Sequence, residues 1–259
     1  MSPDVTAAVA LLLVAAALGA WGVVALVRSP LSVTLSLVYG FDVLVARLLW
    51  RAQVSNRLPI PPGMGAVLVA NHRTSADPFV IQPAVRRVIH WMVAKEYYRR
   101  PVLGRLLWFF GAIPTSRSGI DTASVRTAMR LVSDGKLVGM FPEGRINRSS
   151  DLLLPSHAGA ALVALRARVP IVPCYVEGMP YTGTVLGPFF TPARVRVKIG
   201  QPLHLNEYYD RGEERPVLEE ITLRTMREIA RLAGRPDYEP RLLRSRPAQS
   251  TGDLPAQGP

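Results

Sequence analysis

Residues 66–78 read AVLVANHRTSADP, and this stretch decides the fold. Residues 66–69 are apolar and rich in valine, which is typical of a strand that is buried on both faces. At the other end, Asp77-Pro78 provides a helix N-cap followed by proline at the first helical position. The stretch therefore predicts a buried strand, a turn that carries His72, and a helix.

This turn places an imidazole and a carboxylate five positions apart. On a regular helix they would not share a face, because neighbours on one face are three or four residues apart. In a turn that closes at the start of a helix, the carboxylate of Asp77 can fold back onto one nitrogen of His72. That contact would fix the tautomer and stabilise the imidazolium, leaving the other nitrogen free to take a proton from a hydroxyl group. A satisfied polar contact without catalysis is the alternative.

Length and composition restrict the class of function. The 259 residues, 49% of them hydrophobic, can form one large domain with appendages. The formal net charge of +12 favours an anionic partner, and charge alone leaves open nucleic acid, anionic membrane and phosphorylated small molecules. The single cysteine, Cys174, excludes an internal disulfide and a cysteine-rich metal site. Neither zinc-ligand spacing nor a glycine-rich phosphate loop occurs, so we expect no metal and no bound cofactor.

The N-terminus predicts attachment to a membrane through residues 1–50. Residues 7–27 form an uncharged apolar run that is long enough to cross a bilayer. Arg28 and later arginines place the bulk of the chain in the cytoplasm, at the inner or plasma membrane. Residues 31–50 are also apolar but contain one acidic and one basic residue, which favours an interfacial helix. A helical hairpin that dips into a single leaflet is the alternative.

Beyond a Pro- and Gly-rich linker at residues 51–65, strand patterns alternate with helix patterns. Such alternation predicts an α/β domain with a mixed, largely parallel sheet flanked by helices. Residues 234–259 show little apolar periodicity and predict a disordered basic tail. The expected strands are residues 66–69, 88–94, 137–141, 170–176 and 194–199, and the expected helices are residues 78–87, 122–133, 157–168 and 216–233.

Three further segments carry side chains suited to a ligand. Residues 111–117 read GAIPTSR, in which a turn precedes Arg117, and its guanidinium suits bidentate recognition of phosphate. Residues 141–145 read FPEGR, where a buried strand ends in a carboxylate beside an arginine, as at the ligand sites of open α/β sheets. Solvated surface arginines and a surface ion pair are the alternatives. Residues 91–110 mix arginines with aromatic residues such as Trp91, which indicates a lipid surface, an acyl groove or core packing.

Taken in order, these blocks resemble the glycerolipid acyltransferase family, of which 1-acylglycerol-3-phosphate acyltransferase (lysophosphatidic acid acyltransferase) is the best-known bacterial member. The resemblance covers roughly residues 58–202 and implies an acyltransferase domain at residues 51–233. It is carried by the blocks at residues 71–77, 111–117, 141–145 and 169–173.

The resemblance also implies a role for each site residue. His72 would be the general base, and Asp77 would orient it. The family often has Thr-Arg after Glu-Gly, whereas this chain has Arg145-Ile146, which leaves the acceptor open. The residues that would bind the acceptor are Arg117, Glu143, Gly144 and Arg145.

The implied reaction moves a fatty acyl group from an acyl-CoA or acyl-carrier-protein thioester to the free hydroxyl of 1-acylglycerol 3-phosphate. The product would be phosphatidic acid, in phospholipid synthesis, and no nucleic acid would be a partner. The alternatives are another lysophospholipid or glycolipid acceptor, and a non-catalytic module that binds anionic membranes. A serine esterase that uses Ser75 is a further alternative, although a serine in this turn is more simply a helix cap, and no Gly-x-Ser-x-Gly surrounds it.

Overall fold

The computed structural model describes residues 5–7, 9, 12–14, 16, 19–20, 32–116 and 121–243. The apolar run at residues 7–27 therefore lies largely outside the described residues, and Arg117 lies wholly outside them. Within the described ranges, no helix combines the length and the apolar character that crossing a membrane requires.

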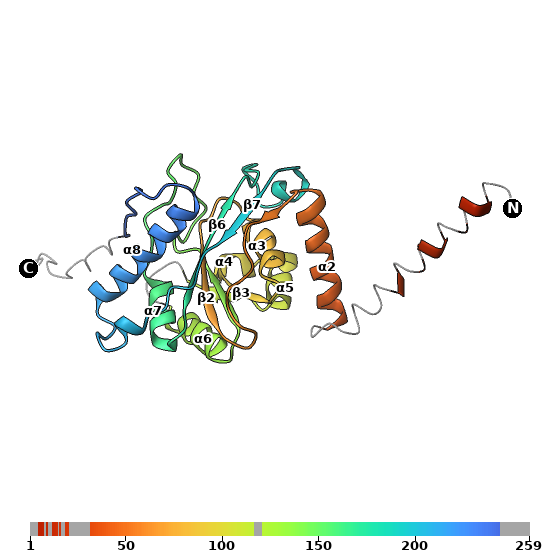
Figure 1. The fold of residues 1–259 in the computed structure, drawn as a ribbon. Coiled ribbons are helices and arrows are strands. Elements are labelled where there is room, and N and C mark those ends of the chain that lie inside the picture. The colour runs from red at the N-terminus through yellow and green to blue at the C-terminus, as the bar shows by residue number, and fades with distance from the viewer. Residues whose placement is uncertain are drawn as a thin grey trace, which may run out of the picture.

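A seven-stranded sheet forms the centre of the molecule, in the order β1-β7-β6-β2-β5-β3-β4 (Figure 1). Every neighbouring pair is parallel except β6 and β7. The predicted α/β class with a mixed, largely parallel sheet is confirmed. The strands are β1 (Gln53–Val54), β2 (Ala66–Ala70), β3 (Ile89–Ala94), β4 (Ile113–Thr115), β5 (Leu137–Met140), β6 (Ile171–Glu177) and β7 (Arg196–Ile199).

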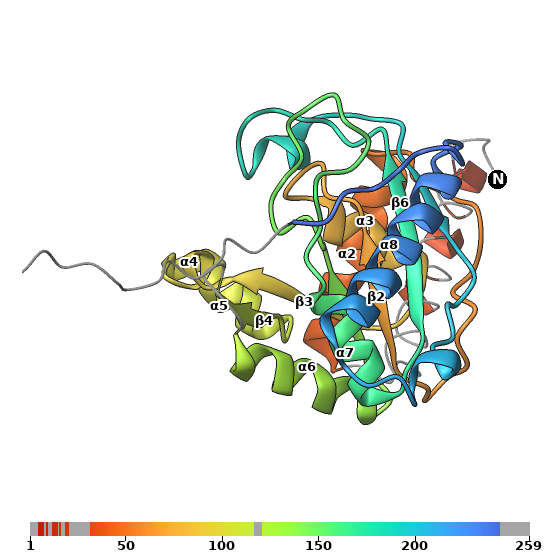
Figure 2. The ribbon, with the colours of Figure 1, turned by 90° about the vertical axis from the view of Figure 1, so that its left-hand side faces the viewer.

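Helices cover both faces of this sheet (Figure 2). One face packs against α6, α7 and α8, and the other against α2 and α3. The helices are α2 (Val33–Leu48), α3 (Asp77–Val85), α4 (Lys95–Tyr98), α5 (Pro101–Phe109), α6 (Thr122–Ser133), α7 (Gly159–Ala167) and α8 (Arg215–Leu232), with 3-10 turns η1 (Gly187–Phe190) and η2 (Asn206–Tyr208).

Strand β2 is buried along its whole length because both of its faces pack into cores. Val67 and Val69 join the core beneath α6, α7 and α8, whereas Leu68 joins the core beneath α2 and α3. Its two parallel neighbours are β5 and β6. The residues that follow β2 therefore emerge in the middle of the sheet, at the carboxyl ends of three parallel strands, where open α/β folds bind ligands.

The predicted elements of strong periodicity agree with the structure. Helix α6 has the predicted bounds, and α3, α7 and β6 differ from the predictions by a few residues. The segment at residues 111–117 was predicted as a turn, but it contains β4, which pairs with β3. A strand of this length leaves no alternation that a sequence pattern can reveal.

The prediction of a disordered tail from residue 234 is wrong for residues 234–243. The hydroxyl of Tyr238 donates to the carbonyl of Leu153 at 2.9 Å. The amide of Leu243 donates to the carbonyl of Ser156 at 2.9 Å. These bonds join the segment to the loop after β5, a partner distant in sequence that periodicity does not show. Residues 244–259 lie outside the described part of the chain.

Helix α2 has an apolar stripe that no described element covers. Its large apolar residues recur every three or four positions, which places them on one side of the helix. An exposed stripe of this kind marks an interaction surface. We call it the α2 ridge, and it consists of Val33, Leu37, Phe41, Leu44 and Leu48, which are 53% to 69% exposed.

The opposite side of α2 buries an acidic residue. Asp42 is 9% exposed, and burial raises the pKa of its carboxyl group to about 8. Among the described residues, none forms an ion pair or a hydrogen bond with this carboxyl group. The folded protein therefore holds a proton on Asp42 at pH values where the unfolded chain has lost it.

We expect Asp42→Asn to remove a pH dependence of stability. The folded-state pKa lies above the unfolded value, so the wild-type protein loses stability as pH rises from the unfolded value through the folded one. The free energy of unfolding should fall by about 2–4 kcal/mol more in the wild type than in the variant between about pH 5 and pH 8. Denaturant titrations at both pH values measure this difference. Equal slopes in the two proteins would contradict a proton held on Asp42.

Candidate functional site

The turn after β2 brings the two predicted side chains together. The Nδ1 atom of His72 lies 2.9 Å from Oδ2 of Asp77. The side chain of Asp77 is fully buried, and that of His72 is 17% exposed. The pair therefore has its carboxylate inside the protein and its imidazole at the edge of the site.

The carboxylate of Asp77 is fixed by the turn that it closes. Its Oδ2 atom accepts hydrogen bonds from the backbone amides of Arg73, at 2.7 Å, and Thr74, at 2.9 Å. Its Oδ1 atom accepts from the hydroxyl of Thr74 at 3.1 Å. Helix α3 begins at Asp77 after an N-cap at Ala76, so Asp77 does not occupy the predicted N-cap. Its carboxylate instead bonds backward onto the turn and holds it in one shape.

These bonds decide which nitrogen of His72 is free. An ionised carboxylate only accepts hydrogen bonds, so Nδ1 must carry the proton that it donates to Asp77. The Nε2 atom then has a lone pair, and no residue in the described ranges bonds to it. An imidazole in this tautomer, backed by a carboxylate, can act as a general base.

A second buried carboxylate holds the backbone of His72. One oxygen of Glu143 accepts from the amide of His72 at 2.9 Å, and the other accepts from the amide of Leu154 at 2.8 Å. Glu143 is 4% exposed, and burial raises the pKa of its carboxyl group while the two amide bonds oppose that rise. Glu143 was expected among the acceptor-binding residues, and in this structure it joins three segments of backbone.

Two stacked aromatic rings support the imidazole. The ring of His72 lies 4.0 Å from that of Phe141 at 12°, and Phe141 lies 4.7 Å from Trp91 at 9°. Trp91 is 7% exposed, so of the three environments predicted for it, the structure shows core packing. Gly139 pairs with Trp91 in the sheet, and a Cβ atom there would lie 2.5 Å from the indole ring. The stack therefore requires glycine at this position.

The loop after β5 folds across the turn. The amide of Asn147 donates to the carbonyl of His72 at 2.7 Å. The guanidinium of Arg73 donates to the carbonyls of Ser149, at 2.8 Å, and Asp151, at 3.0 Å. No sequence pattern predicted a role for Arg73, Asn147 or Phe141, although all three lie in or beside the motifs. Their partners lie in segments that are distant in the sequence, so the spacing of residues within a motif could not predict these contacts.

Of the remaining predicted site residues, the structure describes Gly144 and Arg145 but not Arg117. Gly144 has a φ of 67°, a backbone conformation that favours glycine, and Arg145 is exposed. Within the described chain, Arg145 forms no ion pair. Arg117 lies outside the described residues, and its neighbour Ser116 donates its amide to Asp121 at 2.8 Å.

Ser75 does not cap helix α3. Its hydroxyl donates to the carbonyl of Val185 at 2.6 Å. Ala76 is the N-cap of α3, so the predicted capping by Ser75 is wrong. As for metals, the described ranges contain no group of three or more His, Cys, Asp or Glu residues that could hold an ion.

Comparisons with known proteins agree on one family. Residues 51–177 match the family described as Acyltransferase. The chain is 29% identical over 157 residues to the 1-acyl-sn-glycerol-3-phosphate acyltransferase of Bacillus subtilis. The aligned region covers 60% of this chain and 75% of that protein. It is 32% identical over 152 residues to the protein of that name from Limnanthes alba, and spans 52% of its length.

A solved structure has a similar fold. It is the crystal structure of the 1-acyl-sn-glycerophosphate acyltransferase of Thermotoga maritima, with a TM-score of 0.60 and 19% sequence identity. The match covers 83% of this chain and 89% of the other. At this identity the likeness concerns the fold.

We expect Gly139→Ala to destabilise the protein, because the added methyl group would push Trp91 out of the ring stack. Overpacking of this kind costs about 1–3 kcal/mol of unfolding free energy. Gly159→Ala is the matched control, since no described atom beyond the neighbouring residues and the backbone of its own helix lies within 4 Å of the position that its added methyl group would take. Denaturant titration of both variants measures the difference, and equal stabilities would show that the stack tolerates a side chain at residue 139.

Proposed function

Because this chain belongs to the acyltransferase family, we propose that it transfers a fatty acyl group to the free hydroxyl of 1-acylglycerol 3-phosphate. The donor is an acyl-CoA or acyl-carrier-protein thioester, and the product is phosphatidic acid. The observation that carries the proposal is the 2.9 Å contact between His72 and Asp77, with Nε2 of His72 left unpaired among the described residues.

This geometry supports the following mechanism. As the acceptor oxygen attacks the thioester carbon, Nε2 of His72 takes the hydroxyl proton and Asp77 stabilises the imidazolium that forms. A carbon–oxygen bond forms, the carbon–sulfur bond breaks, and the proton passes to the departing sulfur. The products are an ester and a thiol. General acid-base catalysis of this kind contributes about 10² to 10⁴ in rate.

Acceptor binding rests on the basic residues that follow β4 and β5. Arg117 and Arg145 would bind the phosphate, because a guanidinium recognises phosphate through paired hydrogen bonds. Glu143 would act as a positioning residue, since its two oxygens already accept the amides of His72 and Leu154. Gly144 would allow the turn that presents Arg145, through its positive φ.

We propose that the protein works at a membrane, where a lysophospholipid acceptor resides. The α2 ridge supports this, because a row of large exposed apolar side chains suits the interfacial region of a bilayer. Helix α5 adds Val102, which is 82% exposed, and Trp108, which is 66% exposed. Exposed arginines beside them, at residues 99, 100 and 105, suit anionic head groups. The catalytic domain would face the cytoplasm, which supplies the thioester.

The direct test incubates the purified full-length protein with labelled acyl-CoA or acyl-carrier protein and a panel of acceptors in lipid vesicles. The panel contains lysophosphatidate, other lysophospholipids, glycolipids and glycerol 3-phosphate. We expect lysophosphatidate to react, and His72→Ala to lose a factor of about 10² to 10⁴ in rate. Ser75→Ala is the control for a serine nucleophile and should retain its activity. Reaction of another lysophospholipid alone would replace the acceptor, and undiminished transfer by His72→Ala would refute the role of this histidine.

A second experiment separates positioning from substrate binding at Glu143. In Glu143→Gln, an amide group would face one of the two backbone N–H donors, so one hydrogen bond is lost and the backbone of His72 shifts. We expect kcat to fall by up to about 10²-fold, with the KM for the acceptor changed by less than about twofold. Steady-state kinetics over both substrates measures this. A raised acceptor KM with kcat unchanged would instead make Glu143 an acceptor ligand.

A further inference from the structure

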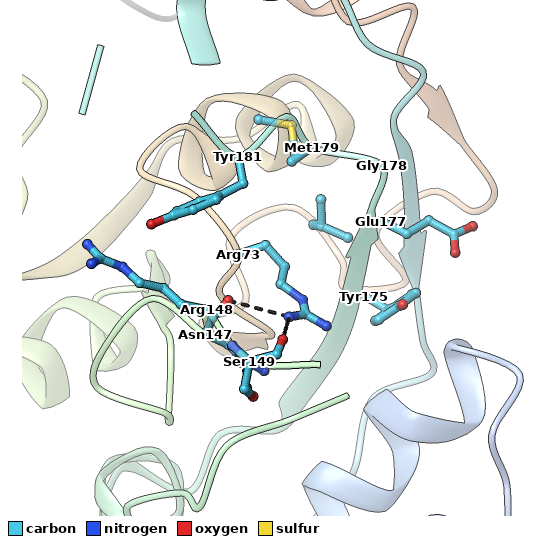
Figure 3. Close-up of a pocket in the computed structure, with 10 residues that line it drawn as sticks. Arg73, Asn147, Arg148, Ser149, Tyr175, Glu177, Gly178, Met179 and Tyr181 are labelled. Atoms are coloured by element: carbon cyan, nitrogen blue, oxygen red, sulfur yellow. Dashed lines mark hydrogen bonds between the residues drawn. The ribbon is translucent and has the colours of Figure 1, made fainter. Parts of the chain in front are cut away.

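A cavity of about 360 Å³ lies beside the catalytic turn, and the proposed mechanism does not use it (Figure 3). Its walls come from the turn after β2, the loop after β5 and the end of β6. A ligand pocket in proteins commonly measures about 300–1,000 Å³, so this cavity can hold a substrate group. The lining residues that matter are Arg73, Arg148, Tyr175, Glu177, Met179 and Tyr181.

The charges around this cavity are positive. Arg73 is held in place by backbone carbonyls, including those of Ser149 and Asp151. Neither Arg73 nor Arg148 forms an ion pair with any carboxylate of the described chain. Glu177 also lines the cavity, but its carboxylate points away (Figure 3) and lies 3.3 Å from Arg196. Two cations without paired carboxylates in a concave site attract an anionic group.

The wall beside Arg148 is aromatic and apolar. The guanidinium of Arg148 lies 5.9 Å from the ring centroid of Tyr181, which is 53% exposed. Figure 3 shows Met179 beside Tyr181, on the same side of the cavity. A ligand that combines a phosphate with a flexible, partly apolar chain matches a wall of this composition.

The position of the cavity distinguishes between the two substrates. In the sheet, β2 lies between β5 and β6. The blocks proposed to bind the acceptor follow β5 and β4, on one side of β2, whereas Tyr175 to Met179 lie at the end of β6, on the other side. An acyl transfer needs two substrates to meet at His72. A second substrate that approaches from the β6 side would pass through this cavity.

We propose that the cavity binds the phosphate-bearing arm of the acyl thioester donor. Arg148 binds the phosphate, and Arg73, whose guanidinium stays bonded to backbone carbonyls (Figure 3), adds positive charge to the wall. Tyr181 and Met179 contact the pantetheine chain that ends in the thioester. This arm is common to acyl-CoA and to acyl-carrier protein, so the assignment applies to either donor. It rests on the proposed function in taking the donor to be such a thioester.

The test uses the full-length protein and two probes, 4′-phosphopantetheine and pantetheine, which differ only by the phosphate. Arg148 is exposed and makes no ion pair in the described structure, so Arg148→Ala should fold. We expect this variant to bind 4′-phosphopantetheine roughly tenfold or more weakly, as the loss of a charge-assisted hydrogen bond implies. Its affinity for pantetheine and its KM for the acceptor should change by less than about twofold. Calorimetry and steady-state kinetics supply these values.

Arg130→Ala is the matched control, because Arg130 lies on α6 and lines neither site. A raised acceptor KM in Arg148→Ala, with 4′-phosphopantetheine binding unchanged, would assign the cavity to the acceptor and overturn the proposal. Unchanged values for every ligand would also overturn it. Phosphate-dependent binding that Arg148→Ala weakens would uphold the cavity assignment even if no acyl transfer occurs, in which case the proposed function alone fails.

Discussion

The carboxylate of Asp77 sits where water does not reach, and burying an ionised group is tolerated only when its oxygens are hydrogen-bonded. In this protein two backbone amides, a hydroxyl and an imidazole all bond to it. The burial cost therefore disfavours any shape of the turn in which these bonds are broken. The orientation of His72 follows from that constraint, since Nδ1 must face Asp77 and Nε2 must face outward.

A second buried carboxylate connects this turn to the rest of the sheet. Glu143, which follows β5, accepts the amide of His72, which follows β2. Because β2 and β5 are adjacent and parallel, their carboxyl ends lie side by side and a single side chain can join them. Phe141 adds a ring beneath the imidazole, and Gly139 leaves space for the indole beneath Phe141. The sheet order thus determines what surrounds the imidazole of His72.

The proposed reaction has two substrates, and it assigns them to different surfaces around this centre. In the proposed reaction, the loop after β5 would contribute Arg145 to acceptor binding and Arg148 to the cavity assigned to the donor. Asn147, between them, bonds to the backbone of His72. The α2 ridge lies on the face of the sheet that α3 also covers. In this arrangement a lipid acceptor and a thioester donor would reach the imidazole from different directions.

Adjacent residues by themselves determined the apolar run of β2, the ends of α6 and the approach of Asp77 to His72, because these depend on contacts a few positions apart. The family blocks were readable for the same reason, being short and ordered along the chain. Only the tertiary structure decided what supports His72, since His72 and Glu143 are 71 positions apart and leave no pattern in a local window. The sequence left open whether Trp91 lies at a surface or in the core, and the pairing of β3 with β5 places it in the core. Periodicity reports which face of an element is apolar, whereas the order of the strands, which depends on packing the whole chain, fixes which side chains meet at their ends.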